Sequence, residues 1–437
     1  MPERKQSENE LIASLKVFGS RISGPARAKA ELPFIPLPES NKVFEITELL
    51  SQSPLTNDRV LYIHLPFCNQ NCTFCGYYKE IHCGTGLIDK YIRKITGQLE
   101  LLNSYPWFKE KPFHAIYFGG GSPASLSTSQ LTFLMEAVHR FIPQNLNTEL
   151  TVETTVNEVN QTLVNNLVQL GINRMSIGVQ SFNTTLRQSV GRISDRQKVI
   201  ESIQSVHSAG ITNLCIDLIY NLPGQTIESW EDDLQILGEL PVTGCSVYPL
   251  IPFPDSTLVR SGNFIQQTVE DAFKYFTMAD DFLLSLTNWT PFTPVQYGHV
   301  TAGEPKYIKA QGQQSDLLAL GPSAGGRINE YQYLSKYSLE TCLSAGFNFL
   351  LNSSWSSVHK DYISFRHLFS LSEGAGILTD EILSIDQNFA DLIVGLLNRK
   401  LIENIDNKYV MTSTGRFWAG NLSQLLTREI CYLLNKY

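Results

Sequence analysis

The stretch Val60-Leu-Tyr-Ile-His-Leu-Pro-Phe-Cys68-Asn-Gln-Asn-Cys72-Thr-Phe-Cys75-Gly-Tyr-Tyr78 decides the fold and the chemistry that we expect of this chain. It begins as a short apolar strand and runs into cysteines with the spacing Cys68-x3-Cys72-x2-Cys75. Three thiolates on one tight loop can hold three irons of a [4Fe–4S] cluster, whose usual complement is four cysteines. One iron then lacks a protein ligand, and an open metal position is typical of a catalytic site.

A structural zinc site is the alternative interpretation of the same stretch. His64 lies four residues before Cys68 and Cys83 lies eight residues after Cys75, so either side chain can complete a tetrahedral set with the thiolates. Against zinc, His64 falls within the strand pattern. Three aromatic side chains also surround the ligands and suit a shielded cluster, namely Phe67, Phe74 and Tyr77. The spacing and its context therefore favour the iron-sulfur cluster.

The composition is that of an ordinary globular protein. The chain has 437 residues, of which 43% are hydrophobic and 17% are charged, enough for one large domain with additions or for roughly two to three domains. A formal net charge of −8 argues against a nucleic-acid partner, which needs a basic surface. The cysteines suggest no disulfide framework, and the sequence has neither a signal peptide nor an apolar run of about 18 residues. We therefore expect a cytoplasmic protein with no membrane span.

From Arg59 onward, short strand-like runs alternate with helical stretches. The expected strands cover residues 60–65, 114–118, 149–153, 174–179, 214–220 and 245–250, and the expected helices cover 87–103, 129–141, 160–170, 195–209 and 227–239. Strands that alternate with helices form a parallel sheet through right-handed crossovers. Such units curl into a complete or partial barrel, with the site at the carboxyl ends of the strands. The pattern therefore predicts an α/β fold.

We divide the chain into four regions. Residues 1–58 are an N-terminal extension, which is either a lid across the barrel mouth or a tail without fixed structure. Residues 59–255 form the barrel core, and residues 256–370 link it to the end of the chain and cover the substrate. Within that linking region, residues 294–299 are expected to be a loop. Residues 371–437 have helix signals around a strand-like run and predict a small helical, winged-helix-like domain that serves as a cover or an interface.

Unusual residues follow the expected strands, where the fold places a site. The second strand ends in Gly119-Gly120-Gly121-Ser122-Pro123, a backbone that can approach a ligand closely and offer its N–H groups. Glu153 ends the third strand, and the fifth strand carries Asp217. Gln180 ends the fourth strand, and Arg192 lies in the loop that follows it. Each has an ordinary explanation as a turn or a helix cap, but together they line one rim.

Residues 61 to about 250 resemble the radical S-adenosylmethionine (SAM) core of the oxygen-independent coproporphyrinogen III oxidase family. The motifs that carry the resemblance are Tyr-x-His-x-Pro-Phe-Cys, Gly-Gly-Gly-Ser-Pro, Arg174-Met-Ser-Ile-Gly-Val-Gln-Ser-Phe-Asn183 and Ile216-Asp-Leu-Ile-Tyr-x-Leu-Pro-Gly-Gln-Thr226. The resemblance implies a partial (β/α)6 barrel and a role in tetrapyrrole chemistry. It also implies that Cys68, Cys72 and Cys75 are the metal ligands and the catalytic centre. SAM binds the open iron, and an electron from the cluster releases a 5′-deoxyadenosyl radical.

The resemblance also implies two SAM sites. The first is formed by the open iron with Tyr62, Gly120 and Glu153. The second involves Phe74, Gly121, Ser122, Gln180, Arg192 and Asp217. Two positions depart from the oxidase pattern, because Ile251 stands where alanine is expected and Gly325 where isoleucine is expected. Retained SAM residues with altered pocket walls suggest two SAM molecules that serve a different reaction.

The residues after Cys75 help to choose the branch of the family. The oxidase branch has Gly-Cys there, whereas this chain has Gly76-Tyr77-Tyr78 and looks most like the haem-utilisation branch, the anaerobilin synthases. The resemblance then implies anaerobic haem degradation by a radical SAM methyltransferase, which opens the macrocycle to a methylated linear tetrapyrrole and releases iron. The alternatives are an oxygen-independent coproporphyrinogen III oxidase and a non-catalytic haem chaperone.

Partners follow from the same resemblance. Besides the haem substrate, it implies an electron donor such as flavodoxin or a flavin reductase, and a carrier protein for haem or product. Haem propionates need cations, and the candidates are Arg192, Lys306, Lys309 and Arg327. The candidate ligands of the haem iron are His299, His359 and His367. For each of these side chains, a solvated or packed surface position is the alternative.

Overall fold

The computed structural model describes residues 17–18, 20–22, 35–262, 264, 268–335, 338–344, 349–358, 361–374, 376–383, 385 and 387–434. Its central feature is a parallel sheet in the order β2-β5-β6-β7-β8-β9. These strands are β2 (Arg59–Leu65), β5 (Ala115–Gly120), β6 (Glu149–Thr155), β7 (Arg174–Gln180), β8 (Asn213–Tyr220) and β9 (Gly244–Pro249). All six expected strands are confirmed, with ends within about two residues of those predicted.

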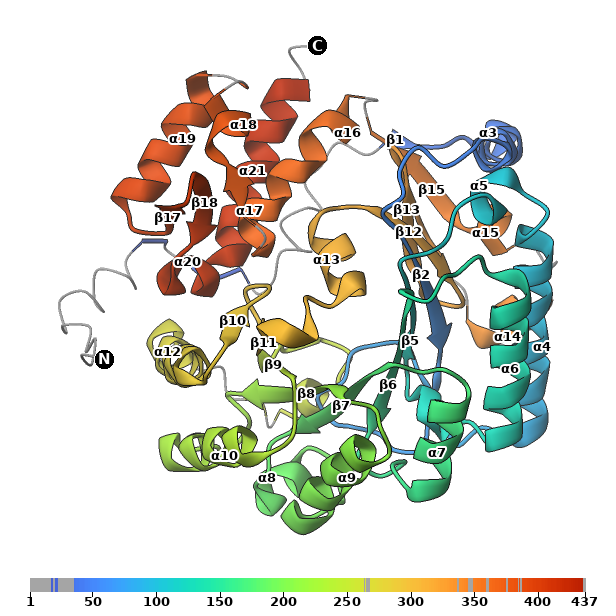
Figure 1. Cartoon of the computed structure of the whole chain (residues 1–437), viewed down its shortest axis with the longest axis horizontal. Helices are drawn as coiled ribbons and strands as arrows, with labels where there is room; N and C mark the ends of the chain where they lie inside the picture. The colour runs from blue at the N-terminus through green and yellow to red at the C-terminus, as the bar shows by residue number, and fades with distance from the viewer. Residues whose placement is uncertain are drawn as a thin grey trace.

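Helices connect these strands and pack around the outside of the curved sheet (Figure 1). They are α4 (Thr85–Leu102), α6 (Thr128–Phe141), α7 (Gln161–Gln169), the short α8 (Thr184–Ser189), α9 (Arg196–Ser208) and α10 (Ile227–Glu239). Side chains cap their starts: Ser127 and Gln130 form a capping box on α6, and Asp195 accepts the backbone N–H of Lys198 on α9. The α/β partial barrel is therefore the observed fold.

The sheet extends beyond the six predicted strands. β12 (Asp316–Leu320) pairs in parallel with β2, and a series of antiparallel strands continues outward from it. These are β13 (Gly325–Ile328), β14 (Tyr331–Leu334), β15 (Ser354–Ser357) and β1 (Ile35–Pro36). α3 (Glu39–Ser51) contacts both α5 (Pro106–Lys109) and α15 (Phe349–Asn352). β12 was not predicted from the sequence, because glycines follow it on both sides of Pro322, although every residue of Asp316–Leu320 is buried.

On the opposite side of the barrel, residues after β9 form a helix and a hairpin. α11 (Thr257–Arg260) and α12 (Val269–Ser285) precede β10 (Trp289–Pro291) and β11 (Gln296–His299), and β11 pairs antiparallel with β9. The prediction of a loop over residues 294–299 is therefore wrong. The backbone of Gln296 to Gly298 completes the hydrogen bonds that β9 would otherwise lack at its edge.

Helix α13 (Lys306–Gly312) lies between the sheet and the C-terminal helices (Figure 1) and enters the barrel from its amino-terminal end. Glu149, the first residue of β6, accepts the backbone N–H groups of Lys306 at 3.0 Å and of Tyr307 at 3.4 Å. The carboxylate thereby satisfies two N–H groups of the first helical turn. Tyr307 is buried, and its ring stacks on that of Tyr117 on β5.

The end of the chain forms a separate group of elements beside the barrel (Figure 1). A small antiparallel sheet, β16 (Ile377–Leu378), β18 (Lys408–Met411) and β17 (Ile402–Ile405), packs with α18 (Thr379–Leu383), α19 (Gln387–Asn398), α20 (Ser413–Phe417) and α21 (Ala419–Leu434). Before it come α14 (Leu339–Ser344), α16 (Tyr362–Phe365) and α17 (Ser370–Glu373). This arrangement agrees with the small helical domain expected from the sequence.

A buried ion pair joins this group to the barrel. Arg416 of α20 donates to both oxygens of Asp280 on α12, at 2.7 and 2.6 Å, and Tyr297 of β11 donates to the same carboxylate at 2.5 Å. Asp280 is fully buried and Arg416 is 8% exposed. Such a pair resists removal of either partner, because the remaining charge would be buried alone.

Few residues of the N-terminal extension before Ile35 are described, and these lie against the C-terminal elements. Arg21 donates to the backbone of Phe417 at 3.0 Å and to the hydroxyl of Tyr220 at 3.1 Å. Half of the candidate lid, residues 1–58, therefore falls outside the described residues, and the lid stays a prediction.

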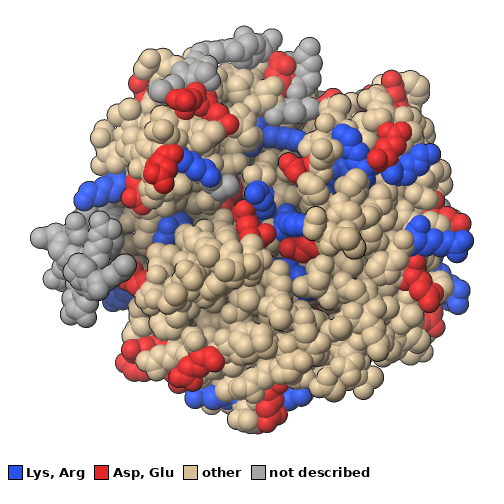
Figure 2. Space-filling model, in the orientation of Figure 1, with Lys and Arg blue, Asp and Glu red and all other residues tan. Residues whose placement is uncertain are grey.

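The face of the molecule seen in Figure 2 carries Lys and Arg interspersed with Asp and Glu around a broad uncharged area. Within the described residues, no helix is both long and apolar enough to cross a membrane.

Candidate active site

The cysteine loop follows β2 and is fixed on three sides. β3 (Phe67–Cys68) pairs with β4 (Glu80–Ile81), the N–H of Thr73 donates to Val190 at 3.1 Å, and the carbonyl of Thr73 accepts from Leu258 at 2.8 Å. Within the loop, the N–H of Cys75 donates to the carbonyl of Cys72 at 3.2 Å. Cys72 is buried, and Cys68 and Cys75 are half-buried. The loop therefore presents the thiols at the carboxyl end of the barrel with its backbone already bonded.

The arrangement of donors fits an iron-sulfur cluster better than a zinc ion. Burial and the neighbouring Cys75 and Cys72 raise the pKa of the Cys68 thiol to about 12, so the three sulfurs lie within electrostatic reach of one another. Yet no three His, Cys, Asp or Glu side chains of the described part of the chain are placed to hold a single metal ion. His64 is also engaged, through Tyr62 Oη at 3.0 Å and the carbonyl of Tyr78 at 3.3 Å. Thiols spread over a loop suit the separate irons of a cluster.

Glu153 lies inside the barrel near the carboxyl end of β6, two residues before Thr155. Its Oε1 accepts the hydroxyl of Tyr117 at 2.5 Å, and its Oε2 accepts the backbone N–H of Gly120 at 3.3 Å. Burial raises the pKa of this carboxyl to about 7, against the opposing effect of the Tyr117 hydrogen bond. Tyr62 faces Glu153 from β2, so the predicted first SAM residues come together in the structure.

The glycine run serves close packing more than hydrogen-bond donation. A Cβ on Gly119 would lie 2.7 Å from Glu153 Oε2, and one on Gly121 would lie 2.5 Å from the carbonyl oxygen of Phe67. Gly120 has φ +109°, which favours glycine. The N–H groups of Gly120, Gly121 and Ser122 already bond to Glu153, Leu65 and Phe67. The prediction that this backbone offers free N–H groups to a ligand is therefore wrong for these three positions.

A second carboxylate, Asp217 of β8, faces the same mouth. Both of its oxygens accept from Ser176 Oγ at 3.4 Å. Burial raises the pKa of Asp217 to about 6, although Ser246, Ser176 and Arg192 oppose that rise. Asp217 is thus a half-buried acid with polar neighbours, and it lies on the next strand but one from Glu153.

The other predicted residues of the second SAM site surround Asp217 and the cysteine loop. Arg192 donates to the carbonyl of Gly178 at 3.2 Å and opposes the rise in the pKa of Cys72. Gln180 has φ +73° at a bulge of β7, which turns its side chain toward Gly178. Ser122 Oγ is buried without a hydrogen-bond partner among the described residues. An unpaired buried hydroxyl at this rim fits a polar ligand.

Phe74 is the aromatic member of that set and is half-buried. It packs on an apolar cluster made of Val190, Ile219, Leu222, Leu250 and Leu258. This cluster supports the cysteine loop from the side of β8 and β9.

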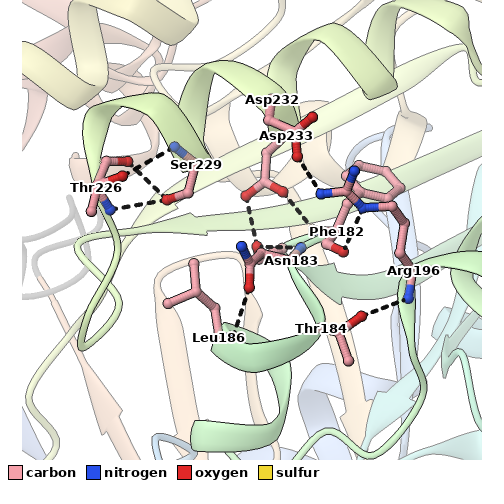
Figure 3. Close-up of polar contacts among 10 residues, drawn as sticks. Phe182, Asn183, Thr184, Leu186, Arg196, Thr226, Ser229, Asp232 and Asp233 are labelled. Atoms are coloured by element: carbon pink, nitrogen blue, oxygen red, sulfur yellow. Dashed lines mark hydrogen bonds and ion pairs between the residues drawn. The ribbon is translucent and has the colours of Figure 1, made fainter.

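The segment after β7 is held in place by contacts with helix α10. Asp233 accepts Ser181 Oγ at 2.7 Å and the N–H of Phe182 at 2.6 Å, and Arg196 pairs with Asp232 (Figure 3). Arg187 of this loop is fully buried and donates to Ser194 at 2.8 Å. These contacts fix the chain on both sides of Gln180 and Arg192.

Three of the four predicted propionate cations lie at the wrong end of the barrel. Lys306 donates to Asn147 just before β6, and Arg327 donates to Ser315 at 2.9 Å just before β12. Lys309 of α13 pairs at 3.4 Å with Glu304, which lies two residues before that helix. The amino ends of the strands cannot meet a substrate at their carboxyl ends, so only Arg192 remains.

The candidate ligands of the haem iron are not placed at the carboxyl ends of the strands either. The imidazole Nδ1 of His299 is hydrogen-bonded to Thr301 Oγ1 at 2.6 Å, and the backbone N–H of His299 donates to the carbonyl of Thr243, just before β9. His367 follows Arg366, which pairs with Asp316 at the start of β12. Both therefore lie toward the amino ends, and His359 lies outside the described residues.

Three aromatic residues of the site were not predicted from the sequence. Tyr117 could have been found, because it precedes Gly119 by two residues and so shares its face of the strand. Phe253 and Tyr307 gave no local signal. Phe253 packs against Gly76, where a Cβ would lie 2.2 Å from its ring, and its ring centroid is 5.7 Å from that of Tyr77.

The two aromatic rings form a platform at the barrel mouth, which we call the Tyr77–Phe253 platform. Tyr77 is 66% exposed, yet it lies within electrostatic reach of both Glu153 and Asp217. Ile251, two residues before Phe253, is half-buried, whereas Gly325 on β13 is exposed.

Comparison with known proteins agrees with this geometry. The model of the radical SAM superfamily matches residues 62–237. The chain is 28% identical to an anaerobilin synthase of Escherichia coli O157:H7 over 93% of each chain, and 31% identical to the heme chaperone HemW of Bacillus subtilis over 81% of this chain and 95% of that one. The solved coproporphyrinogen III oxidase (HemN) of Escherichia coli has the same fold, with a TM-score of 0.73, 20% identity, and coverage of 95% of this chain and 99% of that one.

Proposed function

Because this chain belongs to the haem-utilisation branch of the oxygen-independent coproporphyrinogen III oxidase-like family of radical SAM enzymes, we propose that it opens the haem macrocycle without oxygen. The product would be a methylated linear tetrapyrrole, with release of iron. The observation that carries this proposal is the pair of half-buried carboxylates, Glu153 and Asp217, that face one mouth from separate strands. Two anchors support two SAM molecules, one beside the cluster and one as methyl donor.

The residues of the chain take the following roles in this proposal. Cys68, Cys72 and Cys75 hold three irons, and the reduced cluster, when bound, supplies the electron that cleaves the first SAM. Glu153 receives the amino group of that SAM, beside Tyr62 and Gly120. The second SAM lies against Phe74, Gly121, Ser122, Gln180, Arg192 and Asp217.

In this proposal the tetrapyrrole substrate binds at the Tyr77–Phe253 platform. A planar tetrapyrrole can stack on the exposed ring of Tyr77, to which the half-buried ring of Phe253 is tilted by 53°. Tyr77 also lies within electrostatic reach of both carboxylates. Arg192 is the cation available for a propionate, although its bond to Gly178 also suits the second SAM. We further propose a flavodoxin or flavin reductase as electron donor and a carrier protein for haem or product.

The test is an anaerobic incubation of the cluster-reconstituted protein with haem, SAM and a strong reductant. The proposal predicts that the Soret band collapses while 5′-deoxyadenosine, S-adenosylhomocysteine and a methylated linear tetrapyrrole appear together. Intact haem after SAM cleavage would contradict it. Release of CO2 from coproporphyrinogen would instead identify an oxidase, and transfer of unaltered haem to an acceptor would identify a chaperone.

Two variants separate the proposed SAM sites. Glu153→Gln should suppress formation of 5′-deoxyadenosine, because the first SAM loses the partner of its amino group. Asp217→Asn should reduce S-adenosylhomocysteine more than 5′-deoxyadenosine. Equal loss of both products in both variants would contradict two independent SAM sites.

A further inference from the structure

A stack of tyrosines fills the barrel beneath Glu153. Tyr307, brought in by α13, stacks on Tyr117 with ring centroids 4.2 Å apart, and Tyr62 stacks on both at 6.1 Å. Offset aromatic stacking at such distances favours one relative orientation of the rings. Tyr117 therefore packs against both a neighbour on the adjacent strand and a residue that lies far away in the sequence.

The orientation of Tyr117 determines where its hydroxyl points. That hydroxyl donates to Glu153 Oε1 at 2.5 Å, while Gly120 holds Oε2 at 3.3 Å. Both oxygens of the carboxylate are thus fixed from β5, and the side chain keeps one orientation toward the barrel mouth. A hydrogen bond to a carboxylate favours its ionised form, which is the form that pairs with an ammonium group.

Helix α13 is seated firmly enough to serve as the support. Its first N–H groups bond to Glu149, whose Oε1 also accepts Thr151 Oγ1 at 3.2 Å. Tyr307 Oη is occupied by Gln311, which donates to it at 2.9 Å. Only the ring face of Tyr307 is therefore engaged with Tyr117.

We propose that Tyr117 and Tyr307 are positioning residues for Glu153, with Tyr307 holding the Tyr117 ring so that its hydroxyl orients the carboxylate toward the amino group of the first SAM. This inference rests on the proposed first SAM site. It gives α13, which lies outside residues 62–237, an indirect part in SAM binding through Tyr117 and Glu153.

The test measures SAM affinity by anaerobic calorimetry on the full-length, cluster-reconstituted chain at several pH values. The groups that face Glu153 are Tyr117 and the Gly120 N–H from β5, Tyr62 from β2, Tyr77 from the cysteine loop, Asp217 from β8 and Tyr307 from α13. The pKa values of these tyrosines are raised, so they stay neutral over the range, and Asp217→Asn removes the remaining titrating group. In the parent chain, affinity should rise with pH as Glu153 ionises.

Tyr117→Phe keeps the stack and removes the hydroxyl. We expect SAM affinity near neutral pH to fall about ten-fold, about 1.4 kcal/mol, and the midpoint of the pH profile to move upward. Tyr307→Leu should move both quantities in the same direction by less, whereas Tyr307→Phe keeps the ring and should match the parent chain. The shift caused by Tyr117→Phe should persist in the Asp217→Asn background.

Two results would overturn the inference in distinguishable ways. If Glu153→Gln loses SAM affinity but Tyr117→Phe keeps the parent affinity and midpoint, the SAM site stands and the positioning role is wrong. If Glu153→Gln binds SAM like the parent chain, the proposed site itself is wrong. Iron content and thermal unfolding of each variant show whether the chain has kept its fold.

Discussion

Gly121→Ala tests whether the loop after β5 holds the cysteine loop in place. A Cβ at this position would lie 2.5 Å from the carbonyl oxygen of Phe67 and 2.8 Å from its carbon and nitrogen. Ordinary contact begins at 3.4 Å, so the two backbones must separate by about 0.9 Å. Neither can yield as a flexible side chain would, because both contacts are with main-chain atoms.

The displacement acts directly on the first cluster ligand. The Phe67 carbonyl accepts the N–H of Ser122 at 2.7 Å and the hydroxyl of Ser125 at 3.3 Å, and Phe67 immediately precedes Cys68. Overpacking of a close contact costs about 1–3 kcal/mol, and loss of a hydrogen bond costs about 0.5–1.5 kcal/mol more. We therefore expect the free energy of unfolding to fall by about 1–4 kcal/mol and the cluster to assemble poorly.

The assay compares iron and sulfide per chain after anaerobic reconstitution, together with denaturant unfolding. Gly84→Ala is the matched control, because no atom lies within 4 Å of its added Cβ and Gly84 has φ −67°. Gly84 is the N-cap of α4, where Ala is less favourable than Gly, so the control should lose no more than about 1 kcal/mol and should bind as much iron as the parent chain. The reasoning is refuted if Gly121→Ala binds as much iron as Gly84→Ala and unfolds at the same denaturant concentration.

Three further predictions follow from other contacts. Arg416→Met should lower the free energy of unfolding by about 3–5 kcal/mol, because it leaves Asp280 buried beside Tyr297 without its cation; denaturant unfolding checks this, and an unchanged midpoint would contradict it. Tyr77→Ala or Phe253→Ala should weaken haem binding by about 1–3 kcal/mol in a Soret titration, whereas Tyr77→Phe should keep the parent affinity. Equal haem affinities for all three variants would exclude haem binding at the Tyr77–Phe253 platform. Without SAM, the free energy of unfolding should fall as pH rises from about 4.5 to about 7. Folding raises the pKa of Glu153 from 4.5 to about 7, so the folded chain binds more protons than the unfolded one in this range. Glu153→Gln should flatten that slope in unfolding experiments at several pH values, and an identical slope in both chains would count against the burial of this acid.

The sequence by itself determined the features that depend on local pattern. The spacing of Cys68, Cys72 and Cys75 is a property of one loop, and the alternation of strands and helices from residue 59 to residue 249 depends on side-chain periodicity within each element. Because the carboxyl ends of parallel strands share one edge, the same pattern also indicated that Glu153 and Asp217 face a common mouth.

Only the tertiary structure decided which distant segments complete the barrel. β12 joins β2 as a parallel neighbour, and Tyr307 reaches Tyr117 from 190 positions away, although neither segment has a periodicity that names its partner. The same limit explains the misplaced cations: Lys306 and Arg327 looked available as charges, but the direction in which α13 and β13 enter the fold puts them at the amino ends of the strands. Such contacts are set by packing between elements, which residue type and local spacing do not encode.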